Sequence, residues 1–208
     1  MDRRPVIGLN MSLAAIQDGD RWQAETPVPY VDSVAGAGGL PLLIPPYEDL
    51  TAIYDLALYL DGFVFIGGDD YRPVSYGGHP QPEKELMPER RDRFDLVLAA
   101  WLLEETALPV FGICGGQQLL TIARGGALIQ DIRGEWPSPS GLSPLPHAGR
   151  ERPRETRNAF RHDVAIQPGS LIAGIVGLPE GRPLATNSFH HQAVPPARPG
   201  RDFTATAW

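Results

Sequence analysis

The chain has 208 residues, enough for one domain with a substantial hydrophobic core or for two small ones. Its composition, with 42% hydrophobic and 21% charged residues, is typical of a globular protein. The net charge of −7 argues against general nucleic-acid binding, because phosphate contacts need clustered Lys and Arg. No apolar run approaches the roughly 20 residues that span a bilayer, so we expect no membrane partner.

Cys114 is the single cysteine of the chain. One cysteine excludes an intrachain disulfide and a zinc site built from several cysteines. The N-terminus shows no hydrophobic segment of a signal peptide, and together these features predict a cytoplasmic protein. They leave one free thiol to explain.

The hydrophobic pattern predicts an α/β domain, because short apolar runs beside glycine or proline alternate with segments of helix length. The expected elements, in chain order, are a strand at 6–9, a helix at 29–37, a strand at 40–44, a helix at 50–60, a strand at 63–66, a helix at 89–105, a strand at 109–113, a helix at 117–123, and strands at 128–132, 163–166, 184–186 and 203–208. The strand at 109–113 is apolar throughout, which is typical of a central parallel strand covered on both faces.

Two longer segments are interpreted as loops. Residues 71–88 are rich in Gly, Pro and His and are expected at the surface. Residues 134–158 contain several prolines and little periodicity, so we predict a mobile loop there, within a single domain that spans residues 1–208.

Cys114 stands between an apolar strand and a helix, with Gly112 before it and Gly115 and Gly116 after it. This strand–turn–helix pattern is typical of a nucleophile elbow. We expect the glycines to permit a strained turn and the helix N-terminus to lower the pKa of the thiol. Backbone N–H groups after the cysteine would then point toward an oxyanion. A free cysteine is often a core residue, but this setting favours a nucleophile.

The segment at 112–118, Gly-Ile-Cys-Gly-Gly-Gln-Gln, resembles the G-x-C-x-G-x-Q element of class I glutamine amidotransferase domains. Further segments resemble the peptidase C26 branch, whose namesake activity is gamma-glutamyl-gamma-aminobutyrate hydrolase; they lie at 61–76, 91–95, 125–131 and 187–194. The resemblance implies a flavodoxin-like, doubly wound, mostly parallel sheet, with Cys114 at the carboxyl end of a central strand. At the position of Gly115 the branch often has arginine, so substrate contacts would differ there.

By this resemblance, Cys114 attacks a γ-glutamyl amide and forms a γ-glutamyl thioester, which water hydrolyses. Gly67, Gly68 and Gly115 would contribute backbone N–H groups to the oxyanion hole. Gln118 would bind the glutamyl portion of the substrate at the mouth of the site. The pair Gly67-Gly68 also fits an ordinary turn at the end of a strand. The resemblance implies no cofactor and no metal, and it associates the chain with polyamine catabolism.

His190 and His191 are candidates for the base that a cysteine nucleophile needs. Adjacent histidines on a strand point to opposite faces, so these two would not share a metal. From residue types alone, either histidine would serve Cys114 as base. In the resembled family the base belongs to a His-Pro-Glu motif, and the histidine that matches His190 lines the pocket. We therefore expect His190 to face Cys114 and His191 to point away.

The 208 residues contain no His-Pro-Glu sequence, and they end at Trp208 within an alternating segment. We expect the C-terminal strands and the base to be missing from this chain. Because proton transfer commonly supplies about 10²–10⁴-fold in rate, the 208 residues alone are expected to be inactive or nearly so.

Three functions fit the sequence. The first is a cysteine-dependent hydrolase of γ-glutamyl amides, the second is a glutaminase subunit that supplies ammonia to a synthase partner, and the third is a non-catalytic binding protein that lacks the base. The expected partner is a small γ-glutamyl molecule. The sequence leaves open the amine portion of the substrate, the pathway, and whether the chain forms a homo-oligomer.

Overall fold

The computed structural model describes residues 3–16, 21–82, 86–135, 161–179 and 181–208. The chain divides into two compact units, Met1–Gly126 and Ala127–Trp208, and each is described by itself. The single domain expected across 1–208 stays a prediction. Among the described residues, no helix is long and apolar enough to cross a membrane.

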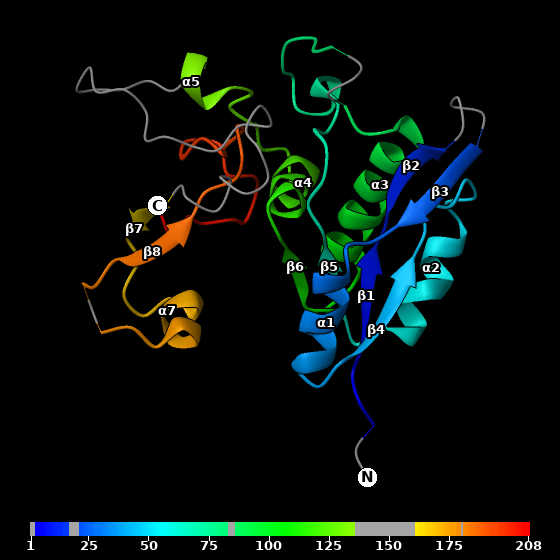
Figure 1. The fold of residues 1–208 in the computed structure, drawn as a ribbon, viewed down its shortest axis with the longest axis horizontal. Coiled ribbons are helices and arrows are strands. Elements are labelled where there is room, and N and C mark those ends of the chain that lie inside the picture. Colours follow the sequence, from blue (N-terminus) through cyan, green and yellow to red (C-terminus); the bar gives the residue numbers. More distant parts are fainter. Residues whose placement is uncertain (1–2, 17–20, 83–85, 136–160, 180) are drawn as a thin grey trace. The chain divides into compact units, whose positions relative to one another are not determined.

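The first unit is built on a four-stranded parallel sheet in the order β4-β1-β5-β6, shown in Figure 1. Its strands are β1 (Val6–Asn10), β4 (Leu40–Ile44), β5 (Gly62–Phe65) and β6 (Val110–Gly112). The chain moves outward from β1 to β4 and then returns to the other side of β1, which creates a topological switch point between β1 and β5. The predicted doubly wound, flavodoxin-like α/β architecture is confirmed.

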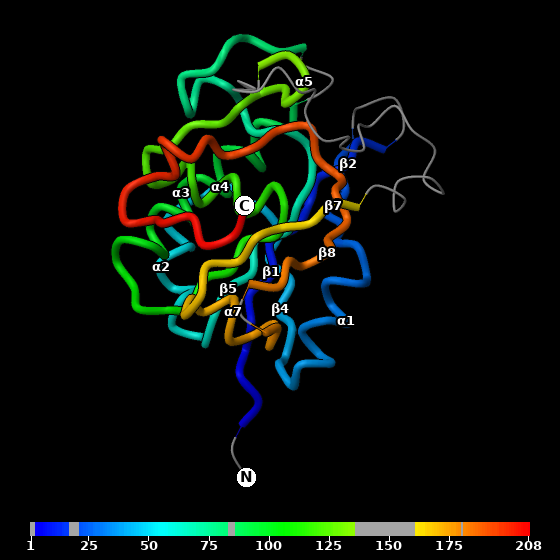
Figure 2. The backbone as a smooth tube through the Cα atoms, turned by 90° about the vertical axis from the view of Figure 1, so that its left-hand side faces the viewer, coloured from blue at the N-terminus to red at the C-terminus, as the bar shows by residue number. Residues whose placement is uncertain are grey.

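Helices cover both faces of this sheet. They are α1 (Val28–Gly36), α2 (Ala52–Leu56) with the 3-10 helix η1 (Ala57–Tyr59), α3 (Glu89–Glu105) and α4 (Gly115–Ala123). Because parallel crossovers are right-handed, the reversal after β4 puts α1 on one face and α2 and α3 on the other. Figure 2 shows this division, with α1 to the right of the strands and α2 and α3 to the left.

The core of the first unit is formed by the sheet and by α3, the longest helix. Among its best buried apolar side chains, all at most 1% exposed, are Leu9, Ile44, Phe63, Phe65, Phe94 and Leu98. The buried residues of α3 recur every three or four positions, as expected for one face of a helix. Three of them, Arg91, Asp92 and Asp95, are charged, so this face brings ionisable groups into the interior.

A hairpin that the sequence analysis did not predict follows β1. It consists of β2 (Ser12–Ile16) and β3 (Arg21–Glu25), paired antiparallel. The dipeptide Asp18-Gly19 between the two strands is a hairpin signal in the sequence. The apolar pattern missed the hairpin because most residues of β3 are exposed.

The second unit contains α5 (Ile132–Glu135), β7 (Arg161–Val164), α7 (Leu171–Val176) and β8 (Leu184–Asn187), with β7 and β8 paired antiparallel. Its helix α7 has clear boundaries. The hydroxyl of Ser170 accepts a hydrogen bond from the Ala173 N–H, and Gly177 ends the helix with a left-handed φ of 66°.

Two strands predicted in the second unit are wrong. Instead of a strand at 128–132, Ile129 makes an isolated bridge to Ala193 and α5 begins at Ile132. Instead of a strand at 203–208, Ala207 makes an isolated bridge to Ile166. Apolar alternation marks residues that can extend, but a strand also needs a partner along several consecutive residues.

The expectations for three other segments have different outcomes. β6 is the edge of the described sheet rather than a central strand, and Phe111 is 61% exposed. The described part of the segment 71–88 is a surface segment with buried anchors, because Val74 is 86% exposed whereas Tyr71, Tyr76 and Met87 are buried. Of the mobile loop predicted at 134–158, residues 136–158 lie outside the described residues.

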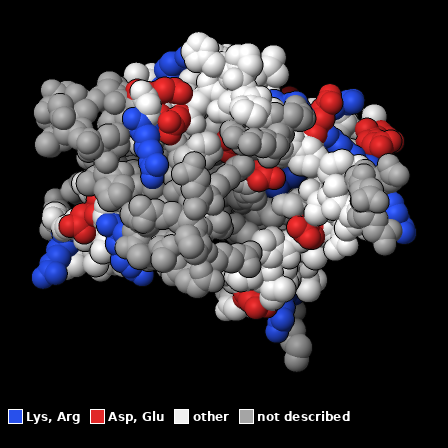
Figure 3. Space-filling model, turned by 45° about the horizontal axis from the view of Figure 1, so that its top comes forward, with Lys and Arg blue, Asp and Glu red and all other residues white. Residues whose placement is uncertain are grey.

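The described charged side chains do not gather by sign on the face that Figure 3 shows. Acidic and basic groups lie interspersed there among uncharged ones.

Candidate active site

The candidate site lies at the carboxyl edge of the first unit's sheet. β5 and β6 run parallel, with Phe65 opposite Gly112, and the Ile113 N–H continues this pairing by donating to the Phe65 carbonyl at 2.9 Å. The segments that follow the two strands therefore meet at one edge. A Cβ atom at Gly67 would lie 3.3 Å from the Cβ of Cys114. The structure thus brings together Gly67-Gly68, called the glycine turn below, and the cysteine that the sequence motifs single out.

Cys114 occupies the turn between β6 and α4 in a strained conformation. Its φ is 54° and its ψ is −112°, a combination that residues with a side chain rarely adopt. The residue is exposed, and its carbonyl accepts the N–H groups of Gln117 and Gln118 as α4 begins. The strained backbone predicted for Cys114 is confirmed.

The glycines beside Cys114 serve close packing rather than unusual dihedral angles. Gly112, Gly115 and Gly116 do not have a positive φ, so they permit the strained turn at Cys114 through close packing. A Cβ at Gly112 would overlap the backbone of Gly116, and one at Gly116 would overlap the carbonyl of Phe65. The absence of side chains lets α4 start directly against the end of β5.

The pKa of the Cys114 thiol is raised overall, so the predicted lowered pKa is wrong, although the first N–H of α4 does act to lower it. Although the residue is exposed, protein surrounds the thiol closely enough for burial to raise its pKa above the usual 9.0. A hydrogen bond with the Gly115 N–H opposes this effect, and the negative charge of Asp70 adds to it. Loss of solvation therefore outweighs the one backbone donor.

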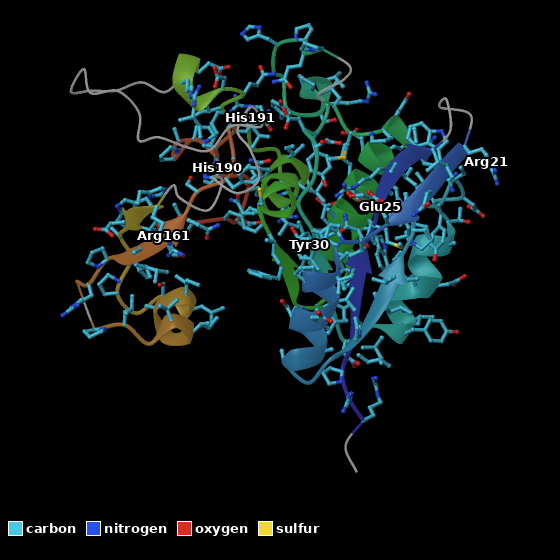
Figure 4. All side chains as sticks on the ribbon, viewed as in Figure 1. Arg21, Glu25, Tyr30, Arg161, His190 and His191 are labelled. Carbon is cyan, nitrogen blue, oxygen red and sulfur yellow. The ribbon has the colours of Figure 1, made fainter. Side chains whose placement is uncertain are left out.

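Tyr30 is a site residue that the sequence analysis missed. It lies on α1, and its hydroxyl is 3.4 Å from the Gly67 nitrogen, which donates to it (Figure 4). No motif in the sequence marks this tyrosine, because α1 reaches the glycine turn only through the fold.

A buried polar cluster lies against the end of β5 and the glycine turn. It consists of Asn10, Tyr71, Arg91 and Asp95. The Oδ2 atom of Asp95 accepts hydrogen bonds from Asn10 Nδ2 at 2.8 Å and from the Tyr71 hydroxyl at 2.9 Å. The Asn10 side-chain oxygen in turn accepts the N–H of Ile66, the residue before the turn, at 2.8 Å. The cluster therefore fixes the end of β5 from within.

Burial raises the pKa of Asp95, and its neighbours Arg91, Asn10 and Tyr71 act in the opposite direction. The other carboxylate oxygen, Oδ1, is buried without a hydrogen-bond partner among the described residues. Burial also raises the pKa of Tyr71, and the charge of Asp95 adds to this effect.

Two other residues predicted for the site, Gln118 and His190, lie in different units. Gln118 is in α4 and is 9% exposed, so its substrate contact at the mouth of the site stays a prediction. His190 belongs to the second unit, and its role toward Cys114 also stays a prediction.

The environment of His190 is defined within its own unit (Figure 4). Its Nδ1 lies 2.8 Å from the Gln192 carbonyl and its Nε2 lies 3.2 Å from the Ser188 hydroxyl. A nitrogen that faces a carbonyl must carry the proton, so Nε2 is the acceptor when the ring is neutral. β8 ends at Asn187, so the prediction that His190 and His191 lie on a strand is wrong.

Comparison of the sequence with models of known protein families identifies the family of this chain. The model described as Peptidase C26 matches residues 5–208. The chain belongs to the Peptidase C26 family. The match covers the strained cysteine, the glycine turn and the charged face of α3.

Individual relatives agree with this membership. A Mycobacterium tuberculosis protein named "Putative glutamine amidotransferase" is 31% identical over 92% of this chain and 58% of its own length. Protein NtpR of Enterococcus hirae is 31% identical over 97% of this chain and 80% of its own. The gamma-glutamyl-gamma-aminobutyrate hydrolase of Escherichia coli O157:H7 is 31% identical over 79% of this chain and 62% of its own. Against the first and third of these relatives, the chain spans less than two thirds of their length.

Proposed function

We propose that this chain supplies the nucleophile of a γ-glutamyl amide hydrolase, which works through a thioester on Cys114. The observation that carries the proposal is an exposed cysteine in a strained turn, directly beside the glycine turn of the neighbouring parallel strand. Membership of the Peptidase C26 family supports this chemistry, as does the name of the Escherichia coli relative.

The proposed reaction has two halves. The Cys114 thiolate attacks the γ-carbonyl carbon, and the electron pair of the carbonyl moves onto oxygen. The C–N bond then breaks, the amine leaves with a proton, and a γ-glutamyl thioester remains on the sulfur. Water adds to the thioester, the C–S bond breaks, and glutamate and the free thiol are released.

The negative oxygen of each tetrahedral intermediate needs hydrogen-bond donors. We assign this role to the backbone N–H groups of Gly68 and Gly115. A Cβ at Gly115 would lie 3.4 Å from the Gly68 nitrogen, so the two residues are neighbours. No acceptor for the Gly68 N–H exists among the described residues, whereas the Gly67 N–H already faces Tyr30.

Contacts to the rest of the substrate are part of the same proposal. Gln118 would bind the glutamyl portion, and His190 would line the pocket or act as base. A second candidate function, hydrolysis of glutamine to supply ammonia, is favoured by the name of the Mycobacterium tuberculosis relative. The two functions share Cys114 and differ in the amine that leaves.

The test separates acylation from turnover. The purified chain is incubated with γ-glutamyl-4-aminobutyrate, with glutamine, and with the α-linked amide of glutamate. Glutamate release and the mass of the intact protein are followed over time. We expect a protein adduct of one glutamyl group with the γ-linked compounds only, and we expect Cys114→Ala to abolish it.

Two outcomes would count against the proposal: an adduct that persists in Cys114→Ala, or no adduct with either γ-linked compound. A higher rate with glutamine than with γ-glutamyl-4-aminobutyrate would favour the ammonia-supplying function. Because the adduct forms in the first half of the reaction, this measurement does not depend on fast hydrolysis of the thioester.

A further inference from the structure

Arg91 is an unusual core residue of the first unit. It lies in α3 and is 2% exposed, although arginine is almost never fully buried without a partner. Its Nε lies 3.2 Å from the Asp95 carboxylate, which is completely buried, one helical turn further on. Burial alone would lower the pKa of Arg91, but Asp95 raises it, so the guanidinium stays charged. A buried pair of this kind often stabilises a fold no better than apolar residues would.

The remaining guanidinium nitrogens of Arg91 point away from Asp95. Nη1 donates to the Ser12 hydroxyl at 2.7 Å. Nη2 donates to the carbonyl oxygen of Gly67 at 3.2 Å. One branch of the side chain therefore reaches the turn that packs against Cys114.

The turn is enclosed between Arg91 and the nucleophile. A Cβ at Gly68 would overlap Nη1 of Arg91, whereas a Cβ at Gly67 would be in contact with Cys114. Gly68 does not have a positive φ, so its backbone conformation would accept a side chain. The glycine is needed at position 68 because the guanidinium lies against it.

We infer that Arg91 is a positioning residue for the oxyanion-binding turn and acts through the Gly67 carbonyl; this inference rests on the proposed function. A donor on the Gly67 oxygen fixes the plane of the peptide that joins Gly67 to Gly68. That plane sets the direction of the Gly68 N–H. A charged donor on the carbonyl also polarises the peptide, which makes its N–H a stronger donor.

Two reagents distinguish positioning from a structural role. p-Nitrophenyl acetate acylates a thiol through a tetrahedral oxyanion, whereas iodoacetamide alkylates it by displacement and forms no oxyanion. Arg91→Lys keeps a positive charge beside Asp95 but cannot reach both Asp95 and Gly67. We expect this variant to lose roughly 10-fold or more in the acylation burst, compared with 10²–10³-fold for removal of a complete oxyanion donor. Its alkylation rate should stay within about 2-fold, since alkylation needs no such donor.

Arg90→Lys is the matched control. Arg90 is the neighbour on α3, and its side chain binds the Pro46 carbonyl and Glu48 rather than the turn. This variant should leave both rates unchanged. Cys114→Ala provides the background reaction of each reagent.

Equal acylation in Arg91→Lys and the parent chain would overturn the inference, and so would an equal fall in both rates. If Arg91→Lys does not fold, as judged by circular dichroism, Ser12→Ala replaces it, because the Ser12 hydroxyl is the acceptor that holds Nη1 of Arg91. The same split between the two reagents is then expected. Neither reagent contains a γ-glutamyl group, so failure of the proposed substrate class and failure of this inference are separate results.

Discussion

At Cys114 the fold combines strain, exposure and a raised pKa. Burial and the charge of Asp70 favour the protonated thiol, and the Gly115 N–H favours the thiolate. Near neutral pH the sulfur is therefore mostly protonated, in contrast to cysteines whose surroundings lower the pKa. A reaction that starts from this thiol needs a base to remove the proton during attack. The helix N-terminus alone does not activate the sulfur.

This balance predicts the pH dependence of Cys114 alkylation. The iodoacetamide rate should rise with pH and reach its midpoint above 9.0, because only the thiolate reacts. Asp70→Asn removes a negative charge that favours the thiol, so its midpoint should move to lower pH and its rate at neutral pH should increase. Asp69→Asn, at the adjacent position, is the control and should keep the parent profile. A midpoint below 9.0 in the parent chain would show that the pKa of Cys114 is not raised. An upward move in Asp70→Asn would show that Asp70 does not raise it.

At the scale of elements, the junction of β5, β6 and α4 depends on space rather than on backbone freedom. Gly116 lies in the first turn of α4, where a Cβ would overlap the Phe65 carbonyl. The neighbour is backbone, which cannot move aside as a flexible side chain can. Position 116 therefore tolerates no side chain. This close packing of α4 against β5 sets the distance between Cys114 and the glycine turn.

Gly116→Ala should consequently destabilise the protein by about 3 kcal/mol or prevent folding, at the upper end of what overpacking costs. Gly36→Ala is the matched control, because Gly36 lies at the end of α1 with no atom within 4 Å of its Cβ position and without a positive φ. It should leave stability unchanged or raise it by up to about 1 kcal/mol. Denaturant unfolding of both variants measures the difference. Equal stability of the two would mean that α4 shifts freely.

The elements differ in how well their sequence predicts them. The strand at 40–44 and the helix at 89–105 agree with the structure to the residue, because Pro45 and Pro88 mark one boundary of each. The strands at 128–132 and 203–208 were wrong because alternation does not identify a pairing partner. The hairpin β2–β3 was missed because its strands bury little apolar surface.

The site was predictable only where motifs are local. The spacing of glycines around Cys114 indicated the turn, and the strand end before Gly67 indicated its neighbour. Tyr30 and Arg91 contact that turn from α1 and α3, and no pattern along the chain reports such contacts. The sign of the pKa shift was also beyond sequence reasoning, because desolvation depends on how closely the fold surrounds the thiol.

At the scale of the molecule, the first unit carries three of its buried charged residues on one helix. Arg91, Asp92 and Asp95 all face inward from α3, and the Asp92 carboxylate accepts the Arg72 N–H at 2.8 Å. Burying ionisable groups links the free energy of unfolding to pH, because the folded and unfolded chains bind protons differently. Asp92 is the better probe of this linkage, since Asp95 is tied to three partners of the cluster.

Asp92→Asn should reveal this linkage. Burial raises the pKa of Asp92 above the ordinary 3.8, and the hydrogen bond from Arg72 only partly opposes it. A carboxyl group whose pKa is higher in the folded chain stabilises the fold below 3.8, and this contribution is lost as pH rises through the folded value. Asparagine keeps the oxygen that accepts the Arg72 N–H and does not titrate. The free energy of unfolding of Asp92→Asn should therefore increase relative to the parent chain between about pH 3.5 and pH 7.

Urea unfolding at a series of pH values measures this difference, with Asp32→Asn as control, because Asp32 is an exposed aspartate on α1. The control should show no such trend. Suppose instead that the parent chain gained stability over Asp92→Asn as the pH rose. The fold would then favour the ionised carboxylate, and burial would not be the dominant influence on the pKa of Asp92. The hydrogen bond from the Arg72 N–H and the positive charge of Arg72 would then outweigh the loss of solvation at Asp92.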